Sequence, residues 1–341
     1  MARLFSLILG GGRLKNISIE GVGASPVNVT GLGPTLLQKL PTTVNQFVVR
    51  NTLLSSPMIV ARLPALDVLG MERALFDTFP SDEAEASVAH ATRTESIHLR
   101  PRVLLYSKTA GFPNTSFGRP STPLPHCVSL DRVEEAHLRT EHADDFSVLT
   151  ALEDAEGTGI HSLELQLDGL SKLAQRFDLQ TLWKSVAWSF PSLKFLTLKL
   201  VHTPTPLTGH PWKAVCICLN SLKADGLNTL TVTLEYGGTS RLDFLRLLMK
   251  FWDWYDLDTA LARFASRCSS MMNIYLEFPR WGMVTQNPWR FEEQEMAGWI
   301  LLDIGINMNL GSIEFGRLSD DQMQVLLPRS YAVANVNVLW L

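Results

Sequence analysis

The sequence predicts an α/β solenoid, a chain of repeated helix–turn–strand units whose strands line one face. Three observations support this prediction. A short apolar motif recurs along most of the 341 residues. Turns containing proline or serine come directly before several copies of the motif, and stripes of apolar residues at helical spacing lie between the copies. We expect a single solenoid over residues 1–341, with loop insertions near 107–126 and 203–211.

The motif is an apolar residue, two residues of any kind, an apolar residue, one residue of any kind and a third apolar residue. Its last two apolar positions are two residues apart, as in a short strand with one buried face. A weaker copy without the first apolar residue contains Ile97 and Leu99. The other copies are Leu14-Ile17-Ile19, Val44-Phe47-Val49, Leu66-Leu69-Met71, Val133-Ala136-Leu138, Ile160-Leu163-Leu165, Leu193-Leu196-Leu198, Leu227-Leu230-Val232, Met271-Ile274-Leu276, Leu310-Ile313-Phe315 and Val333-Val336-Val338.

The segments that precede these copies complete the predicted unit. Leu63-Pro64-Ala65 precedes one copy and Phe190-Pro191-Ser192 precedes another. Proline ends a helix and pushes the residue before it toward extended geometry, so these segments indicate a sharp turn into the strand. Apolar stripes at helical spacing lie within 170–186, 242–252 and 257–265. Each stripe could be a groove for a cofactor or a partner, but we interpret it as the helix face that packs on the sheet.

The spacing of the copies is irregular. It ranges from 22 residues, between positions 44 and 66, to 44 residues, between positions 227 and 271, apart from one longer gap that holds the weak copy. Leucine-rich repeats are usually about 20 to 29 residues long, so these units are longer and looser. The Gly- and Pro-rich residues 107–126 could split the array into two halves. Because the motif resumes unchanged beyond them, we favour one continuous solenoid.

Two stretches carry a resemblance to a known family. The sequences Phe-Pro-Ser-Leu-Lys-Phe-Leu-Thr-Leu-Lys-Leu at 190–200 and Leu-Pro-Ala-Leu-Asp-Val-Leu-Gly-Met at 63–71 resemble the leucine-rich-repeat regions of fungal F-box-like proteins. The resemblance implies a curved solenoid with a strand-lined concave face that recruits a substrate to a ubiquitin ligase. The Leu-Pro-x-Glu-like opening of an F-box is not found near the N-terminus. A Skp1-like adaptor is therefore an implied partner only of a longer form that carries an F-box.

Composition and charge narrow the class of function. Apolar residues make up 46% of the chain and charged residues 19%, with a net charge of −4. Without a basic excess, nucleic acid is not expected as a partner. No apolar stretch reaches the length of a membrane span, so no membrane partner is expected either. The four cysteines, Cys127, Cys216, Cys218 and Cys268, form no C-x-x-C pair, which predicts reduced thiols in the cytoplasm or nucleus.

The candidate binding residues follow from strand alternation. Residues between the buried motif positions face away from the core, which on this fold is the concave face. A basic cluster of Arg50, Arg100, His137 and Arg139 could receive an acidic segment of a partner, whereas the alternative is a plain solvated surface. The candidate protein-binding residues are Arg50, Glu72, His98, Arg100, His137, Arg139, Glu164, Lys199 and Tyr275.

No motif indicates catalysis, a metal or a cofactor. Gly10-Gly11-Gly12-Arg13 lacks phosphate-loop spacing, and His202 and His210 near Cys216 and Cys218 lack metal-ligand spacing. The acidic and aromatic segment 252–258 could belong to a hydrolase, but Asp256 or Asp258 is better interpreted as a helix N-cap before Thr259. We therefore expect a non-enzymatic protein-interaction module without a cofactor. The alternatives are a repeat scaffold with no ligase link and a hydrolase centred on 252–258.

Overall fold

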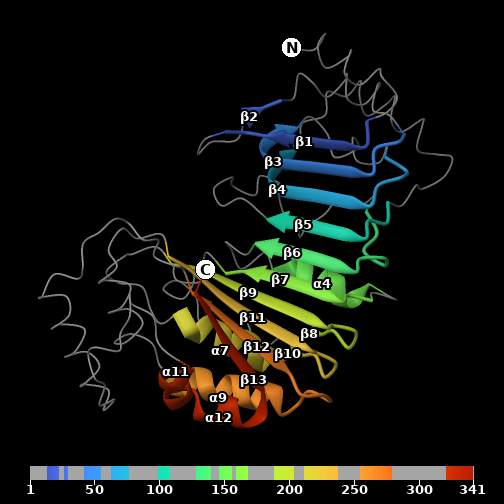
Figure 1. The fold of residues 1–341 in the computed structure, drawn as a ribbon. Helices are drawn as coiled ribbons and strands as arrows, with labels where there is room; N and C mark the ends of the chain where they lie inside the picture. The colour runs from blue at the N-terminus through green and yellow to red at the C-terminus, as the bar shows by residue number, and fades with distance from the viewer. Residues whose placement is uncertain are drawn as a thin grey trace, which may run out of the picture. The chain divides into compact units, whose positions relative to one another are not determined.

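Parallel strands and helices make this an α/β protein (Figure 1). The computed structural model describes residues 14–22, 27–29, 42–54, 63–76, 99–107, 128–139, 146–155, 159–167, 188–202, 211–236, 254–278 and 320–340. The chain divides into two compact units, Met1–Leu163 (unit 1) and Glu164–Leu341 (unit 2). The boundary falls within strand β7 (Ser162–Gln166), not in the Pro-rich residues 107–126.

Unit 1 is built on a parallel sheet with the strand order β1-β3-β4-β5-β6. The short strand β2 pairs with the end of β3. The helix α4 (Phe146–Asp154), which carries buried Val148 and Leu149, belongs to this unit. The strands are β1 (Asn16–Glu20), β2 (Val27–Asn28), β3 (Gln46–Leu54), β4 (Val68–Phe76), β5 (Val103–Ser107) and β6 (Glu135–Arg139).

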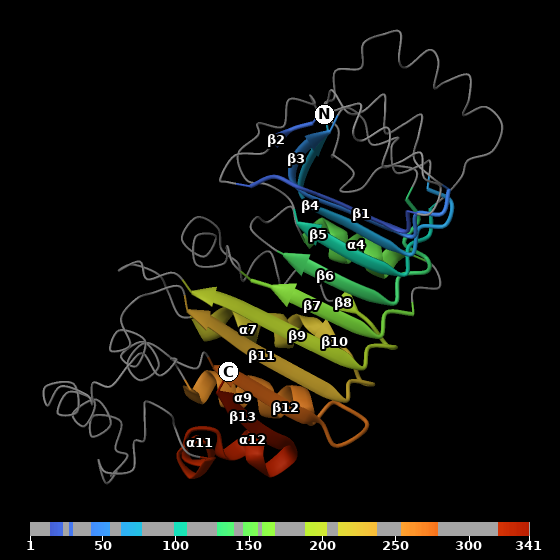
Figure 2. The same ribbon diagram turned by 45° about the horizontal axis from the view of Figure 1, so that its top comes forward.

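Unit 2 has a parallel sheet with the strand order β9-β11-β12-β13 and a separate pairing of β8 with β10. Its helices α7, α9 and α12 pack in series on one face of this sheet in both ribbon views (Figures 1 and 2). The strands are β8 (Trp188–Ser189), β9 (Phe195–His202), β10 (Leu222–Lys223), β11 (Thr229–Tyr236), β12 (Asn273–Phe278) and β13 (Asn335–Trp340). The helices are α7 (Pro211–Ser221), α9 (Trp254–Ala265), α11 (Asp320–Leu326) and α12 (Pro328–Val333).

The motif positions stack on one another across the sheets, as the sequence predicts. In unit 1, Phe47 pairs with Leu69, and both are fully buried. In unit 2, Leu230 lies between Leu196 and Ile274, and all three are fully buried. In-register stacking of branched side chains builds one continuous core layer per unit, which a single repeat could not form alone. The copy at Leu310-Ile313-Phe315 lies outside the described residues.

Strand β5 corrects the weak copy predicted at Ile97 and Leu99. The strand is Val103–Ser107, and its buried residues are Leu104 and Tyr106. Pro101 stands three residues before Leu104, at the motif's first position, and it is buried. Leu99 forms only an isolated bridge with Val128. The motif was hidden because a proline takes the place of its first aliphatic residue.

The turns before the strands also occur as predicted. Leu66 N donates to Leu63 O at 3.1 Å and Leu193 N donates to Phe190 O at 3.1 Å, which closes a β-turn at each proline. A second regularity was not visible in the sequence. In six of the described repeats, the carbonyl of the residue just before the strand accepts two successive amides of the next repeat; for example, Asp67 O accepts from the amides of Arg102 and Val103 at 2.9 and 3.0 Å.

The last two repeats within the described residues depart from the predicted register at their first position. Met271 is 64% exposed and Met272 is fully buried in its place. Likewise Val333, predicted as the first apolar position of the last copy, ends helix α12 and is 38% exposed, whereas Ala334 is buried. The core therefore takes the residue one position later in both repeats. Adjacent Met271 and Met272 have the same hydropathy, so the sequence alone could not choose between them.

Asn51 in β3 and Arg73 in β4 have left-handed backbone conformations, with φ of 49° and 52°. Asn tolerates this region better than most residues, and Asn51 Nδ2 also donates to Gly21 O at 3.2 Å. The left-handed residue Asn51 changes which positions of β3 are buried. Before it the buried Phe47 and Val49 are at odd-numbered positions, and after it the buried Leu54 is at an even-numbered one.

We expect Asn51→Val to lower the free energy of unfolding by about 2 kcal/mol, because a β-branched residue is strained at positive φ and the Gly21 contact is lost. Asn51→Gly keeps the backbone geometry without strain and should change the stability by less than about 1 kcal/mol. Urea denaturation followed by circular dichroism measures both. Equal losses for the two variants would contradict the assignment to backbone strain.

Candidate functional site

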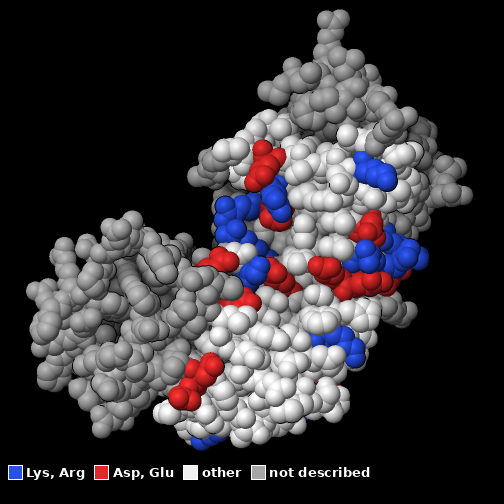
Figure 3. Space-filling model, viewed as in Figure 1, with Lys and Arg blue, Asp and Glu red and all other residues white. Residues whose placement is uncertain are grey.

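The strand face of unit 1 carries charged residues in paired arrangements. Its strand register places Glu20, Arg50, Glu72, Ser107 and Arg139 in one row across the sheet. Arg50 Nε lies 3.1 Å from Glu72 Oε1, and on β6 His137 Nε2 lies 2.6 Å from Glu135 Oε1. Figure 3 shows Lys, Arg, Asp and Glu side chains gathered over this unit. The face is therefore of mixed charge.

The residues of the predicted basic cluster do not form a purely basic surface. Arg50, His137 and Arg100 each have a carboxylate beside them, with Arg100 Nη1 at 3.4 Å from Asp131 Oδ2. Arg100 also precedes β5 and is not on the strand, while His98 lies outside the described residues. The sequence could not show these pairings, because Glu72 and Asp131 lie far from Arg50 and Arg100 along the chain.

Two other outward positions of unit 1 have little exposed surface. Val48 is 3% exposed although it lies on the outward side of β3. It lies over Gly70 of β4, where an added Cβ would stand 2.8 Å from Val48 Cγ1. The missing side chain of Gly70 thus admits Val48, and this close contact covers the middle of the neighbouring row, which consists of Ser18, Val48, Gly70, Leu105 and His137.

The strand face of unit 2 has a different chemistry. We call it the unit 2 open face, and it consists of the outward residues in the first three register rows of β9, β11, β12 and β13. The strand register arranges these residues in three rows. The start row is Phe195, Thr229, Asn273 and Asn335; the middle row is Thr197, Thr231, Tyr275 and Asn337; the end row is Lys199, Thr233, Glu277 and Leu339.

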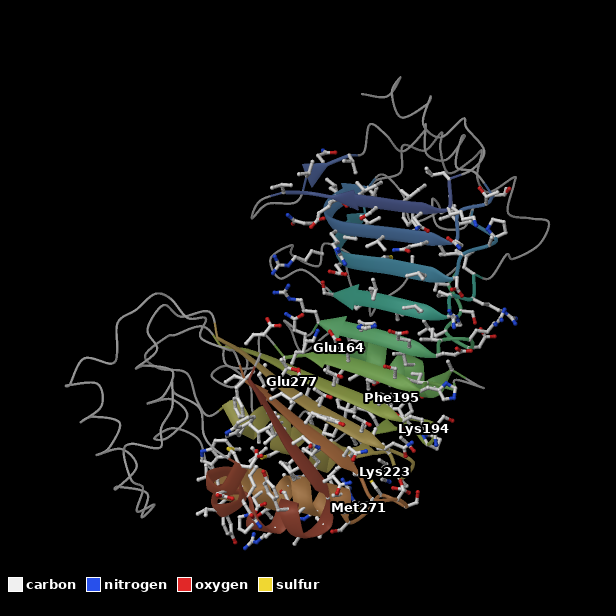
Figure 4. The ribbon with its side chains drawn as sticks, in the orientation of Figure 1. Glu164, Lys194, Phe195, Lys223, Met271 and Glu277 are labelled. Carbon is white, nitrogen blue, oxygen red and sulfur yellow. The ribbon has the colours of Figure 1, made fainter. Side chains whose placement is uncertain are left out.

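Within these three rows the charged residues are confined to the end row, where they are bonded; Glu235, exposed one row further along β11, is also charged. Lys199 Nζ lies 2.8 Å from Glu164 Oε1, and Thr233 Oγ1 donates to Glu277 Oε2 at 2.6 Å. The start and middle rows contain hydroxyl, amide and aromatic side chains alone. In Figure 3 the surface over these strands is correspondingly almost free of blue and red. Figure 4 places Glu164 and Glu277 toward the carboxyl ends of the strands, with Phe195 and Met271 near the strand starts.

Of the predicted site residues, Glu164, Lys199 and Tyr275 lie in or beside the open face. The start row was missed. Its residues have the same outward parity as Thr197, Thr231 and Tyr275 but come two residues earlier. The alternation of side chains along a strand could have identified them, because each strand begins one residue before the second motif position and that first residue also points outward.

The acidic and aromatic segment has a structural part in unit 2. Helix α9 begins at Trp254, so the prediction of an N-cap at Asp256 or Asp258 is wrong. Asp258 is 2% exposed, and its carboxylate accepts hydrogen bonds from Arg329 N at 3.1 Å, Ser330 N at 2.8 Å and Ser330 Oγ at 2.7 Å. It therefore caps the start of α12 across 72 residues of sequence. A substrate could not reach this carboxylate, and Asp253 lies outside the described residues.

The described cysteines are free thiols. Cys218 is fully buried on α7, and Cys216 and Cys268 are half-buried, whereas Cys127 lies outside the described residues. Burial raises the pKa of Cys218 to about 12, because the thiolate would lose its hydration.

We expect Cys218 in the native chain to resist iodoacetamide at pH 8, since its thiolate fraction there is about one in ten thousand. Cys216, two residues away and half-buried, is the internal comparison. Mass spectrometry of the labelled chain, with and without urea, gives the readout. Native labelling of Cys218 as fast as that of Cys216 would contradict the burial of this helix face.

Two kinds of site are not seen in the part of the chain that the structure describes. Within these ranges, no three His, Cys, Asp or Glu side chains are grouped so that they could hold a metal ion. None of the described helices combines the length and apolar character needed to span a bilayer.

Comparison with protein-family models, with curated proteins and with solved structures found no match to this chain. The unit 2 open face is the candidate site on geometry and composition alone.

Proposed function

We propose that this protein is a leucine-rich-repeat-like solenoid that binds another protein through the unit 2 open face. The observation that carries the proposal is the composition of the start and middle rows. The eight outward positions of these rows, on four adjacent strands, hold three asparagines, three threonines, one phenylalanine and one tyrosine, with no charged residue among them.

Such a surface suits protein recognition for physical reasons. Interface centres are depleted in charged residues, whose desolvation is expensive, and enriched in aromatic residues. Tyr275 offers large contact area with few rotatable bonds, while Thr and Asn side chains can donate or accept hydrogen bonds. The strands beneath are fixed by continuous parallel ladders, so the face is pre-organised and little entropy is lost on binding.

The unit 1 strand face is less suited to binding a partner than the unit 2 open face. Arg50 is already paired with Glu72 at 3.1 Å and Glu135 is already bonded to His137 at 2.6 Å, so a ligand would have to displace these contacts before making its own. The open face of unit 2 has no such cost in its first two rows.

The finer part of the proposal is a link to a ubiquitin ligase. It rests on the resemblance of 63–71 and 190–200 to the repeat regions of F-box-like proteins, in which a strand-lined face recruits the substrate. A plain repeat scaffold with the same open face is the other form of the proposal, and a partner search separates the two.

The test is affinity purification of the tagged full chain from its native cells, followed by mass spectrometry. We expect specific partners that are lost with Thr197→Lys/Thr231→Lys, since two buried ammonium groups without counter-charges oppose complex formation. Asn16→Lys/Ser18→Lys adds the same charge to exposed positions of unit 1 and should retain the partners. Loss with both variants or with neither would overturn the assignment to this face. Recovery of a Skp1-like adaptor and a cullin would favour the ligase link, and partners without them would favour the scaffold.

A further inference from the structure

We propose that the edge of unit 2 at the strand starts recognises an acidic peptide segment that carries a bulky apolar residue. We call this surface the unit 2 start edge and define it as Lys194, Phe195, Lys223 and Met271. The inference rests on the proposed function, because the edge adjoins the start row of the open face at Phe195, and it names the chemistry of the partner. Figure 4 shows the four residues along the same edge of the unit.

Hydrogen bonds between successive turns place these residues side by side. Lys194 O accepts from the amides of Asn228 and Thr229, both at 3.0 Å. The next turn is joined in the same way: Ser269 N donates to Asp225 O at 2.9 Å, and Ser270 Oγ donates to Asn228 Oδ1 at 3.3 Å. The turns that carry Lys194, Lys223 and Met271 are thus consecutive steps of one surface.

The apolar part of the edge consists of two large side chains that the fold does not use. Phe195 is 51% exposed at the first position of β9, although aromatic residues usually bury most of their surface. Met271 is 64% exposed at the repeat position where Leu193 and Leu227 are fully buried. Met272 fills the core in its place, so the core does not require an apolar residue at 271.

The charge beside these side chains is positive. Lys194 and Lys223 are exposed, and neither makes an ion pair within the described ranges. Lys194 Nζ lies 3.9 Å from the position that a Cβ on Gly226 would occupy, so its ammonium lies over the turn between β10 and β11. Arg267 is engaged elsewhere, donating to Leu219 O at 2.8 Å. Asp225 supplies one acidic group in the same turn.

This combination selects one class of occupant. Two exposed ammonium groups attract carboxylates. They lie on a chain whose net charge is −4, so the charge of the start edge is opposite in sign to the net charge of the chain. A nucleic acid or an anionic membrane would need a longer run of cations. A peptide with carboxylates next to a Leu, Phe or Trp side chain can satisfy the lysines and cover Phe195 and Met271 at the same time.

The experiment is selection of a random 12-residue peptide library displayed on phage against the full chain, followed by fluorescence anisotropy of the enriched peptides. We expect the enriched peptides to place Asp or Glu beside a bulky apolar residue. Phe195→Ser/Met271→Ser should weaken their binding at least tenfold. Lys194→Gln/Lys223→Gln should weaken it at least threefold at low salt and flatten the dependence of Kd on salt.

The control variants replace cationic or apolar side chains that lie outside the start edge. Lys15→Gln/Arg132→Gln removes two exposed cations of unit 1, and Val22→Ser/Val325→Ser removes two exposed apolar side chains; both should bind as the native chain does. Enrichment of peptides without carboxylates, equal binding by the edge variants, or no enrichment would overturn this inference. If the peptides or native partners lose binding with Thr197→Lys/Thr231→Lys but not with the edge variants, the proposed function stands and the start-edge inference alone fails.

Discussion

Asp258→Ala is expected to lower the free energy of unfolding by about 3 kcal/mol. The carboxylate is 2% exposed and accepts from two backbone amides and one hydroxyl at the start of α12. Alanine leaves those donors without their acceptor in a site that water does not readily enter. Ser330 is itself fully buried, so its amide and hydroxyl cannot turn to solvent instead.

Two further variants isolate the cause. Asp258→Asn keeps one acceptor oxygen and nearly the same shape, and we expect it to lose less stability than the alanine variant. Asp256→Ala removes a carboxylate from the exposed side of the same helix and should cost less than about 1 kcal/mol. Urea denaturation followed by tryptophan fluorescence is suitable, because Trp254 packs against Trp212 on α7 with ring centroids 5.5 Å apart. If Asp258→Ala and Asp256→Ala lose the same stability, the contact with α12 does not stabilise the fold.

The strands could be predicted from the sequence because their determinants are local. A buried position every second residue, preceded by a turn residue such as Pro64 or Pro191, specifies a half-buried strand without any knowledge of its neighbours. The same locality explains the omissions. Pro101 hid strand β5, and Pro211 was assigned to a loop although proline suits the first turn of a helix such as α7.

The candidate site could be predicted only in part. Strand parity correctly placed Thr231 and Tyr275 on the outward side. The sequence could not show which charged residues form ion pairs, because Arg50 contacts Glu72 and Lys199 contacts Glu164 from different strands. Contacts between residues far apart in sequence, such as Asp258 with Ser330, depend on helix packing and leave no local pattern. Asp258 was therefore predicted to cap the start of its own helix, whereas it caps the start of α12.

Leu230→Ala should produce a loss of about 3 to 4 kcal/mol in the free energy of unfolding. Leu230 is fully buried in β11 and pairs on one side with Leu196 and on the other with Ile274. Both neighbours are held in place by their own backbone ladders, so they cannot move in to fill the space. The variant thus loses the transfer free energy of the removed atoms and also retains a cavity.

The adjacent residue provides the matched comparison. Thr231→Ala lies on the same strand one position later, on the open face, and we expect a change below about 1 kcal/mol. Thermal and urea denaturation of the two variants measure the difference directly. Similar losses would mean that β11 is buried on both faces, and the open face could then not accept a partner. A large loss at 230 with a small one at 231 would separate the core side from the binding side, because only a face that tolerates substitution without unfolding can be tested, or can evolve, as a recognition surface.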